Sequence, residues 1–255
     1  MKILKEKLDS LIEKKFIQDF KFELKKLKSV YPFNELEYTM SYLLSKGGIT
    51  FEEYKELRES YVKRNTYLPT YEMAPRTFGE TWGELHLKKI ELELKTPKKS
   101  IDKNYTGQYD LYLPHNGKNI KIEVKASRVA SKILNKKKQK KKSLIERALL
   151  LEDNDDYLMN FQQLKPSCCD VFIWLAVYKN HIKYWVLKND IVKTHKDFGP
   201  QHRNKDTDRR EVGYKKSEIF EGQIMITNNN VESLNKYLVN PKNLKEAIIK
   251  QFNTL

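Results

Sequence analysis

Two carboxylates and a lysine near the middle of the chain have a spacing that suits hydrolysis of a phosphodiester. Asp110 lies in a β-favouring segment at residues 109–113, and Glu123 and Lys125 belong to a second such segment that begins at Ile120. Side chains two residues apart on a strand share a face, so Glu123 and Lys125 are predicted to lie together. Pairing of the two strands would bring Asp110 beside them.

This cluster has the chemistry of a magnesium site. Two carboxylates and a backbone carbonyl, that of Val124, supply the hard oxygen ligands that Mg²⁺ prefers. A bound Mg²⁺ lowers the pKa of a water molecule and neutralises charge on a phosphodiester, and Lys125 could position that water or stabilise negative charge. The alternative is a surface ion pair of Glu123 with Lys121 or Lys125, since 33% of the residues are charged.

The two segments have the pattern of a β-hairpin with one buried face. Residues 114–117 lie between them, and their Asn-Gly dipeptide is a strong signal for a tight hairpin turn. The second strand also carries three aliphatic side chains on its other face, those of Ile120, Ile122 and Val124. We therefore predict that this other face packs on a core.

The hairpin resembles the PD-(D/E)XK nuclease superfamily, and most closely its type II restriction endonucleases. The resemblance lies in Asp110 on one strand and Glu123-Val124-Lys125 on the next, and it covers about residues 84–190. It implies that Asp110, Glu123 and the Val124 carbonyl hold one or two Mg²⁺ ions and that Lys125 activates or positions the water. Tyr109 stands where the family motif has proline.

Such sites often include an acid from an upstream helix, and Glu84 is the residue that could supply it. Thr81 and Glu84 have the spacing of a capping box, which predicts a helix running to about Lys95. Glu84 could therefore assist catalysis, or it could only cap the helix and complement its dipole. Both roles remain open.

The charge of the chain favours a polyanionic partner. The 255 residues include 49 Lys and Arg against 34 Asp and Glu, a formal net charge of +15. The predicted DNA-binding residues are Ser127 and Arg128 after the hairpin, Lys136, Lys137 and Lys138 in a lysine-rich run, and Gln201, His202, Arg203, Asn204, Lys205, Arg209 and Arg210 within residues 198–216. Arg, Asn and Gln can read base edges in the major groove, although both later segments could simply be solvated basic loops.

We predict two domains, a helical N-terminal region at residues 1–75 and a catalytic domain at residues 76–255. Apolar periodicity indicates helices at residues 1–30 and 35–44, and a Thr50–Glu53 capping box opens another that runs to about Arg64. A helix, a Gly-Gly turn and a helix resemble a helix-turn-helix. The acidic charge of the last helix favours a buttress or a dimer surface over DNA contact.

The remaining segments complete a mixed α/β domain. Residues 171–178 form a continuous apolar run typical of a buried central strand, and residues 184–187 follow as an antiparallel strand. Further predictions are a helix at residues 143–151, an edge strand at 224–227 and a mostly helical end at 231–252, which is interrupted at Pro241. The predicted fold is α/β, in detail α+β: a mixed central β-sheet flanked by helices, which the resemblance makes a restriction-endonuclease-like core.

Other sequence features narrow the class of protein. The adjacent Cys168 and Cys169 cannot form a CxxC zinc half-site and are predicted to be small core residues. The charged N-terminus and the short apolar runs predict neither a signal peptide nor a membrane span, which fits the cytoplasm. The sequence has no P-loop motif, and its five histidines lack the spacing of an HNH site.

The resemblance therefore implies a Mg²⁺-dependent, sequence-specific endonuclease of double-stranded DNA, a type II restriction enzyme. Restriction enzymes of this kind usually act as symmetric homodimers. Such enzymes often accompany a methyltransferase that acts on the same site, as part of a restriction-modification pair. The alternatives are a DNA repair or recombination nuclease with the same core, and a basic DNA-binding protein without catalytic activity.

Overall fold

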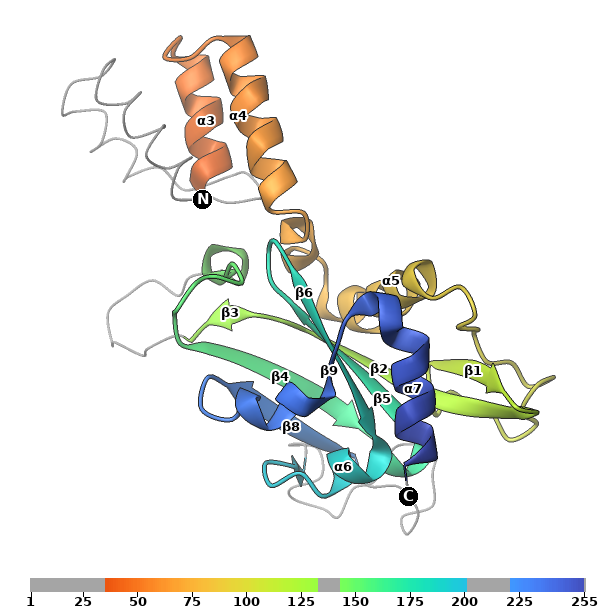
Figure 1. Cartoon of the computed structure of the whole chain (residues 1–255). Coiled ribbons are helices and arrows are strands. Elements are labelled where there is room, and N and C mark those ends of the chain that lie inside the picture. The colour runs from red at the N-terminus through yellow and green to blue at the C-terminus, as the bar shows by residue number, and fades with distance from the viewer. Residues whose placement is uncertain (1–34, 133–142, 201–220, 255) are drawn as a thin grey trace. The chain divides into compact units, whose positions relative to one another are not determined.

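The computed structural model describes residues 35–132, 143–200 and 221–254 (Figure 1). The chain divides into two compact units, and the smaller one contains Met1–Met73, Ile133–Asp153 and Tyr178–His181. The larger unit contains Ala74–Lys132, Asn154–Val177 and Ile182–Leu255. The roles proposed for residues 1–75 stay predictions, and the helix expected at residues 1–30 lies outside the described residues.

The described part of the smaller unit contains the helices α3 (Glu35–Ser45) and α4 (Phe51–Arg64), which the sequence predicted. The capping box that opens α4 is present, because the Thr50 N–H donates to Glu53 Oε2 at 2.8 Å and the Glu53 N–H donates to Thr50 Oγ1 at 3.1 Å. The helices share a buried cluster with the 3₁₀ turn η1 (Leu68–Tyr71) and with Ala148. Its members are Met40, Leu43, Ile49, Leu57, Tyr61, Leu68, Tyr71 and Ala148.

The prediction of a helix at residues 143–151 is wrong. Only one 3₁₀ turn forms there, η3 (Ile145–Arg147), and Ala148 then adopts an extended backbone conformation. The Leu149 carbonyl accepts from the Lys179 N–H at 3.0 Å, and the Leu151 N–H donates to Asn180 Oδ1 at 3.0 Å. The turn at residues 179–180 therefore takes the Leu151 N–H, which a helix through residue 151 would have paired internally, and also satisfies the Leu149 carbonyl.

The larger unit contains a mixed sheet, as predicted, and the sheet has five strands. Its strands are β1 (Leu111–His115), β2 (Lys118–Arg128), β5 (Val171–Val177), β6 (Ile182–Lys188) and β9 (Leu238–Val239), in that spatial order. Strands β2 and β5 are parallel, whereas the other neighbours are antiparallel. Every residue of β5 is buried, which confirms the predicted central strand and its continuous apolar pattern.

The β1–β2 hairpin also forms where the sequence placed it. Asn116 and Gly117 have φ angles of 47° and 75°, the left-handed pair that a type I′ turn requires. The first strand is shifted relative to the prediction, because pairing runs from Leu111 opposite Ile122 to His115 opposite Lys118.

A second sheet covers part of the first and was not predicted. Its order is β3 (Ala130–Ser131), β4 (Tyr157–Leu164), β8 (Gly222–Thr227) and β7 (Gly199–Pro200). The Phe161 ring of β4 stacks on Trp174 of β5 with a centroid distance of 4.5 Å, which joins the two sheets. The predicted edge position of residues 224–227 is wrong, because β8 pairs with β4 on one side and β7 on the other.

Helix α5 (Gly83–Ile90) packs on β2 from the other face, and Gly83 permits the close approach (Figure 1). A Cβ on Gly83 would lie 3.4 Å from the Val124 side chain and 3.6 Å from that of Ala126. The helical turns begin upstream in the π-helix η2 (Thr77–Trp82), so the predicted capping box at Thr81 is wrong. The helix also ends at Ile90, and Lys95 instead forms a β-bridge with Tyr112.

The C-terminal segment is helical in part. It contains the 3₁₀ turns η6 (Val231–Tyr237) and η7 (Pro241–Asn243), and helix α7 (Leu244–Asn253) then packs on β5 and β6. The predicted interruption lies at β9 and Asn240, directly before Pro241. Within the described parts of the chain, no helix has the length and apolar character needed to cross a membrane.

Candidate active site

The hairpin brings Asp110 next to the second strand at the point where regular pairing stops. The Asp110 N–H donates to the Ile122 carbonyl at 3.0 Å, and its carboxylate Oδ2 accepts the N–H of Val124 at 2.7 Å. Since Leu111 stands opposite Ile122, Asp110 lies opposite Glu123, one step further along the pair. The side chain of Asp110 thus caps a backbone donor and also faces the acidic residue of β2.

Glu123 and Lys125 lie on the same face of β2 and form a buried ion pair. Lys125 Nζ is 2.6 Å from Glu123 Oε1, and Glu123 is only 2% exposed. The ion pair with Lys125 that the alternative named does form, but it is not at the surface, because both side chains are largely shielded from water. Lys121 pairs elsewhere, with Asp102 at 2.9 Å.

The charges in this cluster strongly affect one another. Burial raises the pKa of Glu123 to about 7, and the negative charge of Asp110 adds to the rise although Lys125 opposes it. Burial alone would lower the pKa of Lys125, but the charges of Glu123 and Asp110 raise it, so the lysine stays protonated. Two neighbouring carboxylates, one of them holding its proton near neutral pH, form a site that a further cation would stabilise.

The donor set fits Mg²⁺. The N–H and C=O of one strand residue point to the same side, so the Val124 carbonyl faces the side on which Asp110 accepts the Val124 N–H. No group of three or more His, Cys, Asp or Glu side chains able to hold a metal occurs among the described residues. Asp110 and Glu123 would therefore supply two side-chain ligands, and the Val124 carbonyl and water would supply the others, as Mg²⁺ commonly accepts.

Glu84 does not have the position expected of a helix cap. It is the second residue of α5, which continues directly from the π-helix, so it does not open the helical segment. Its neighbour Gly83 lies against Val124 and Ala126, whose side chains point away from the face of Glu123 and Lys125. A catalytic contribution of Glu84 stays a prediction.

Two residues predicted to bind DNA are engaged within the domain. Ser127 is buried, and its Oγ accepts the N–H of Asn160 at 3.1 Å. The Arg128 guanidinium lies 4.6 Å from the centre of the Phe78 ring, a cation–π arrangement. The other predicted DNA contacts, Lys136, Lys137, Lys138, Gln201, His202, Arg203, Asn204, Lys205, Arg209 and Arg210, lie outside the described residues.

Phe78 is the first of four stacked aromatic rings, an arrangement that was not predicted. Successive centroid distances are 5.3 Å from Phe78 to Trp82, 5.0 Å from Trp82 to His86 and 6.0 Å from His86 to Tyr184. His86 Nε2 is also 2.7 Å from the Tyr184 hydroxyl. The spacing of four residues between Phe78, Trp82 and His86 was the signal available for it.

Two more residues, Lys165 and Cys169, interact electrostatically with Glu123, and nothing in the sequence connected either of them with the acidic cluster. The charge of Lys165 lowers the pKa of Glu123. Cys169 is buried, and burial followed by the charge of Glu123 raises the pKa of its thiol well above the usual range. The latter fits the predicted core role and argues against a reactive thiolate.

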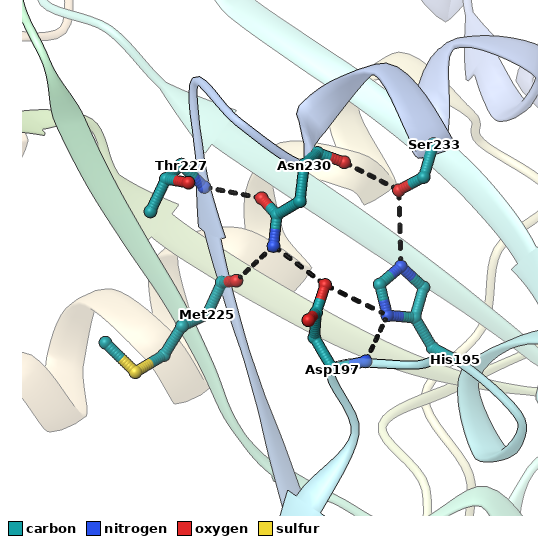
Figure 2. Close-up of polar contacts among 6 residues, drawn as sticks. All are labelled: His195, Asp197, Met225, Thr227, Asn230 and Ser233. Atoms are coloured by element: carbon teal, nitrogen blue, oxygen red, sulfur yellow. Dashed lines mark hydrogen bonds and ion pairs between the residues drawn. The ribbon is translucent and has the colours of Figure 1, made fainter.

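A second polar cluster has the residue types of a serine hydrolase but the wrong hydrogen bonds (Figure 2). Ser233 Oγ donates to the Asn230 carbonyl at 2.6 Å, and His195 Nδ1 accepts the N–H of Asp197 at 3.2 Å. His195 Nε2 therefore carries the proton toward Ser233, at 3.3 Å, and cannot act as its base. The cluster is structural.

Comparisons with protein-family models, with curated proteins and with solved structures found no match. The chemistry of the acidic cluster is therefore the basis for a functional proposal.

Proposed function

We propose that the protein is a Mg²⁺-dependent, sequence-specific endonuclease of double-stranded DNA, with the PD-(D/E)XK arrangement of a type II restriction enzyme. The observation that carries the proposal is the cluster of Asp110, Glu123 and Lys125 around the Val124 backbone. A mixed sheet with α5 on one face is compatible with a restriction-endonuclease-like core. The net charge of +15 supports a DNA partner.

The residues of the cluster would have two roles, metal binding and positioning of the reacting groups. Asp110, Glu123 and the Val124 carbonyl would hold Mg²⁺, which when bound makes water more acidic and offsets charge on the phosphate. Without metal, the charges of Glu123 and Asp110 raise the pKa of Lys125 against its burial, so its ammonium is available as a hydrogen-bond donor. Its ammonium, fixed by Glu123, would orient the attacking water or stabilise charge on the phosphate.

A purely structural role explains the cluster less well. A buried carboxylate whose pKa is raised to about 7 gains little for folding, since its desolvation offsets much of the attraction to Lys125. Perturbed acids of this kind concentrate at functional sites. The non-catalytic DNA-binding protein is thus the weaker alternative, while a repair or recombination nuclease would use the same residues.

Homodimer formation, a methyltransferase partner and a cytoplasmic location belong to the same proposal. The dimer, the methyltransferase partner and a catalytic role for Glu84 come from the resemblance to restriction enzymes, whereas the cytoplasmic location comes from the charged N-terminus and the short apolar runs of the sequence. A two-fold dimer would cut both strands of a symmetric site.

The proposal is tested by comparing how fast the wild type and the Asp110→Asn variant nick supercoiled plasmid DNA. Asparagine retains an oxygen that can accept the Val124 N–H, so the fold is preserved while the charge is lost. We expect wild-type nicking with Mg²⁺, none with EDTA, and a loss of roughly 100-fold or more in the variant. The control is Asp190→Asn, at an exposed position on α6 (Asn189–Lys193), which should retain wild-type activity. Equal nicking by Asp110→Asn would contradict the proposal.

A further inference from the structure

The loop that leads into Asp110 carries three exposed lysines. The loop spans residues 98–109, and Lys98, Lys99 and Lys103 each lie at an exposed position. Among the described residues, the ammonium groups of these lysines have no hydrogen-bond or ion-pair partner. Asp102 is the only acidic residue of the loop, so positive charge is in excess there.

Asp102 anchors this loop to strand β2. Its carboxylate Oδ2 lies 2.9 Å from Lys121 Nζ, and the Tyr109 hydroxyl donates to the same oxygen at 3.1 Å. Lys121 Nζ also lies 5.1 Å from the centre of the Tyr109 ring, a cation–π arrangement. The one negative charge of the loop is therefore engaged by Lys121, whereas the three exposed lysines remain available to a partner.

The anchor lies next to the acidic cluster, on the same face of β2. Lys121, Glu123 and Lys125 alternate along this strand, so their side chains leave it on one face. Two residues of a strand span about 7 Å, which separates the Cα atoms of Lys121 and Glu123. The loop also continues directly into Asp110, whose Oδ2 accepts the Val124 N–H at 2.7 Å. The ion pair, the strand period and the continuity of the chain thus place the loop at the border of the cluster.

Hydrogen bonds within the loop hold its backbone in a defined conformation. The Lys98 carbonyl accepts the N–H groups of Ile101 and Asp102 at 2.9 and 3.0 Å. The Asp102 carbonyl accepts the Tyr105 N–H at 2.9 Å, and Asp102 Oδ1 accepts the Asn104 N–H at 3.0 Å. A loop that is ordered before a partner arrives loses less entropy when it binds.

We propose that Lys98, Lys99 and Lys103 bind DNA backbone phosphates that flank the phosphate to be cut. The inference rests on the proposed function, because DNA that reaches Asp110 and Glu123 would pass along this loop. Lysines contact phosphates as point charges and carry no base preference, so the loop strengthens the binding of every sequence. Its role is to position the duplex, whereas the acidic cluster performs the chemistry.

The test measures the binding of a short DNA duplex in EDTA over a range of salt concentrations. The loop variant combines Lys98→Gln, Lys99→Gln and Lys103→Gln. The matched control removes the same charge at exposed positions of α6, η7 and α7, with Lys193→Gln, Lys242→Gln and Lys250→Gln. Each lost phosphate contact should reduce the slope of log affinity against log salt by about 0.9, so we expect a reduction of about 2–3 in the loop variant and the wild-type slope in the control.

Mg²⁺-dependent cleavage supplies a second readout. Lysines that bind the duplex equally in the ground state and the transition state lower KM and leave kcat unchanged. The loop variant should therefore have a raised KM and a kcat close to that of the wild type. A lowered kcat with an unchanged KM would contradict a positioning role.

Equal salt slopes in the loop variant and the matched control would overturn the proposal. The binding measurement does not depend on cleavage, so the two proposals can fail separately. A wild-type protein that binds DNA without cutting it, and whose salt slope falls in the loop variant alone, would refute the nuclease and retain the loop as a phosphate contact.

Discussion

Two features of its surroundings disfavour the charged form of Glu123, its buried position and the negative charge of Asp110. The residue is 2% exposed, and burial together with the charge of Asp110 raises its pKa from 4.5 to about 7 despite the ion pair with Lys125. The folded protein therefore keeps a proton that the unfolded chain releases at lower pH. This difference makes stability depend on pH.

We predict that the free energy of unfolding, measured without divalent metal, includes a contribution from Glu123 that is lost as pH rises from 4.5 to 7. Between these values the folded state binds the proton and the unfolded state does not, so the contribution is present at low pH and lost at higher pH. Glu123→Gln is neutral throughout and lacks this loss. Urea unfolding should therefore show that, as pH rises across this range, the free energy of unfolding of the variant increases relative to that of the wild type by on the order of 1–3 kcal/mol.

The comparison with Glu123→Gln removes pH effects from other groups, such as His86 and His195, whose pKa values burial lowers. The exposed Glu232→Gln serves as a matched control and should follow the wild type. Parallel curves for wild type and Glu123→Gln would show that the pKa of Glu123 is not raised.

At the scale of elements, one asparagine joins the second sheet to the segment after α6 (Figure 2). Asn230 Oδ1 accepts the Thr227 N–H at 2.8 Å, and Nδ2 donates to the Met225 carbonyl and to Asp197 Oδ2 at 2.9 Å each. The side chain thus holds the end of β8 in a tight turn.

Replacement of Asn230 with alanine should destabilise the protein by about 1–3 kcal/mol, because several backbone and side-chain groups lose their partner together. The neighbouring Asn229 is exposed, and Asn229→Ala should change stability by less than about 0.5 kcal/mol. Thermal or urea unfolding measures both. Equal effects of the two substitutions would argue against the network.

Elements with strong local signals were predictable from sequence. The Asn-Gly turn, the apolar run of β5 and the Thr50–Glu53 capping box each depend on residues close in the chain. The pattern at Thr81 and Glu84 misled because the helical turns already begin before Thr77, so Thr81 lies inside them. The local pattern alone cannot tell a cap from the middle of a longer helix.

The second sheet was missed for a different reason. The exposed pair Gln162 and Gln163 interrupts the alternation of β4 at its bulge, and the partner strand β8 lies some sixty residues further along the chain. Such a pairing has no local signature.

At the scale of the whole molecule, the observed contacts of the candidate site are local in the sequence. Asp110, Glu123 and Lys125 belong to one hairpin, so their proximity followed from strand period and turn chemistry. The positively charged segments proposed to follow DNA lie outside the described residues, and their contribution is a matter for binding and cleavage experiments.

The central claim is that Glu123 belongs to a metal-dependent site that cuts DNA at defined sequences. The most direct measurement is digestion of a phage genome by wild type and Glu123→Gln, each with Mg²⁺ and with EDTA. We predict discrete fragments only for the wild type with Mg²⁺. A Glu123-dependent smear would indicate a repair-type nuclease instead, and intact DNA in every lane despite tight binding would contradict the claim that this cluster is catalytic.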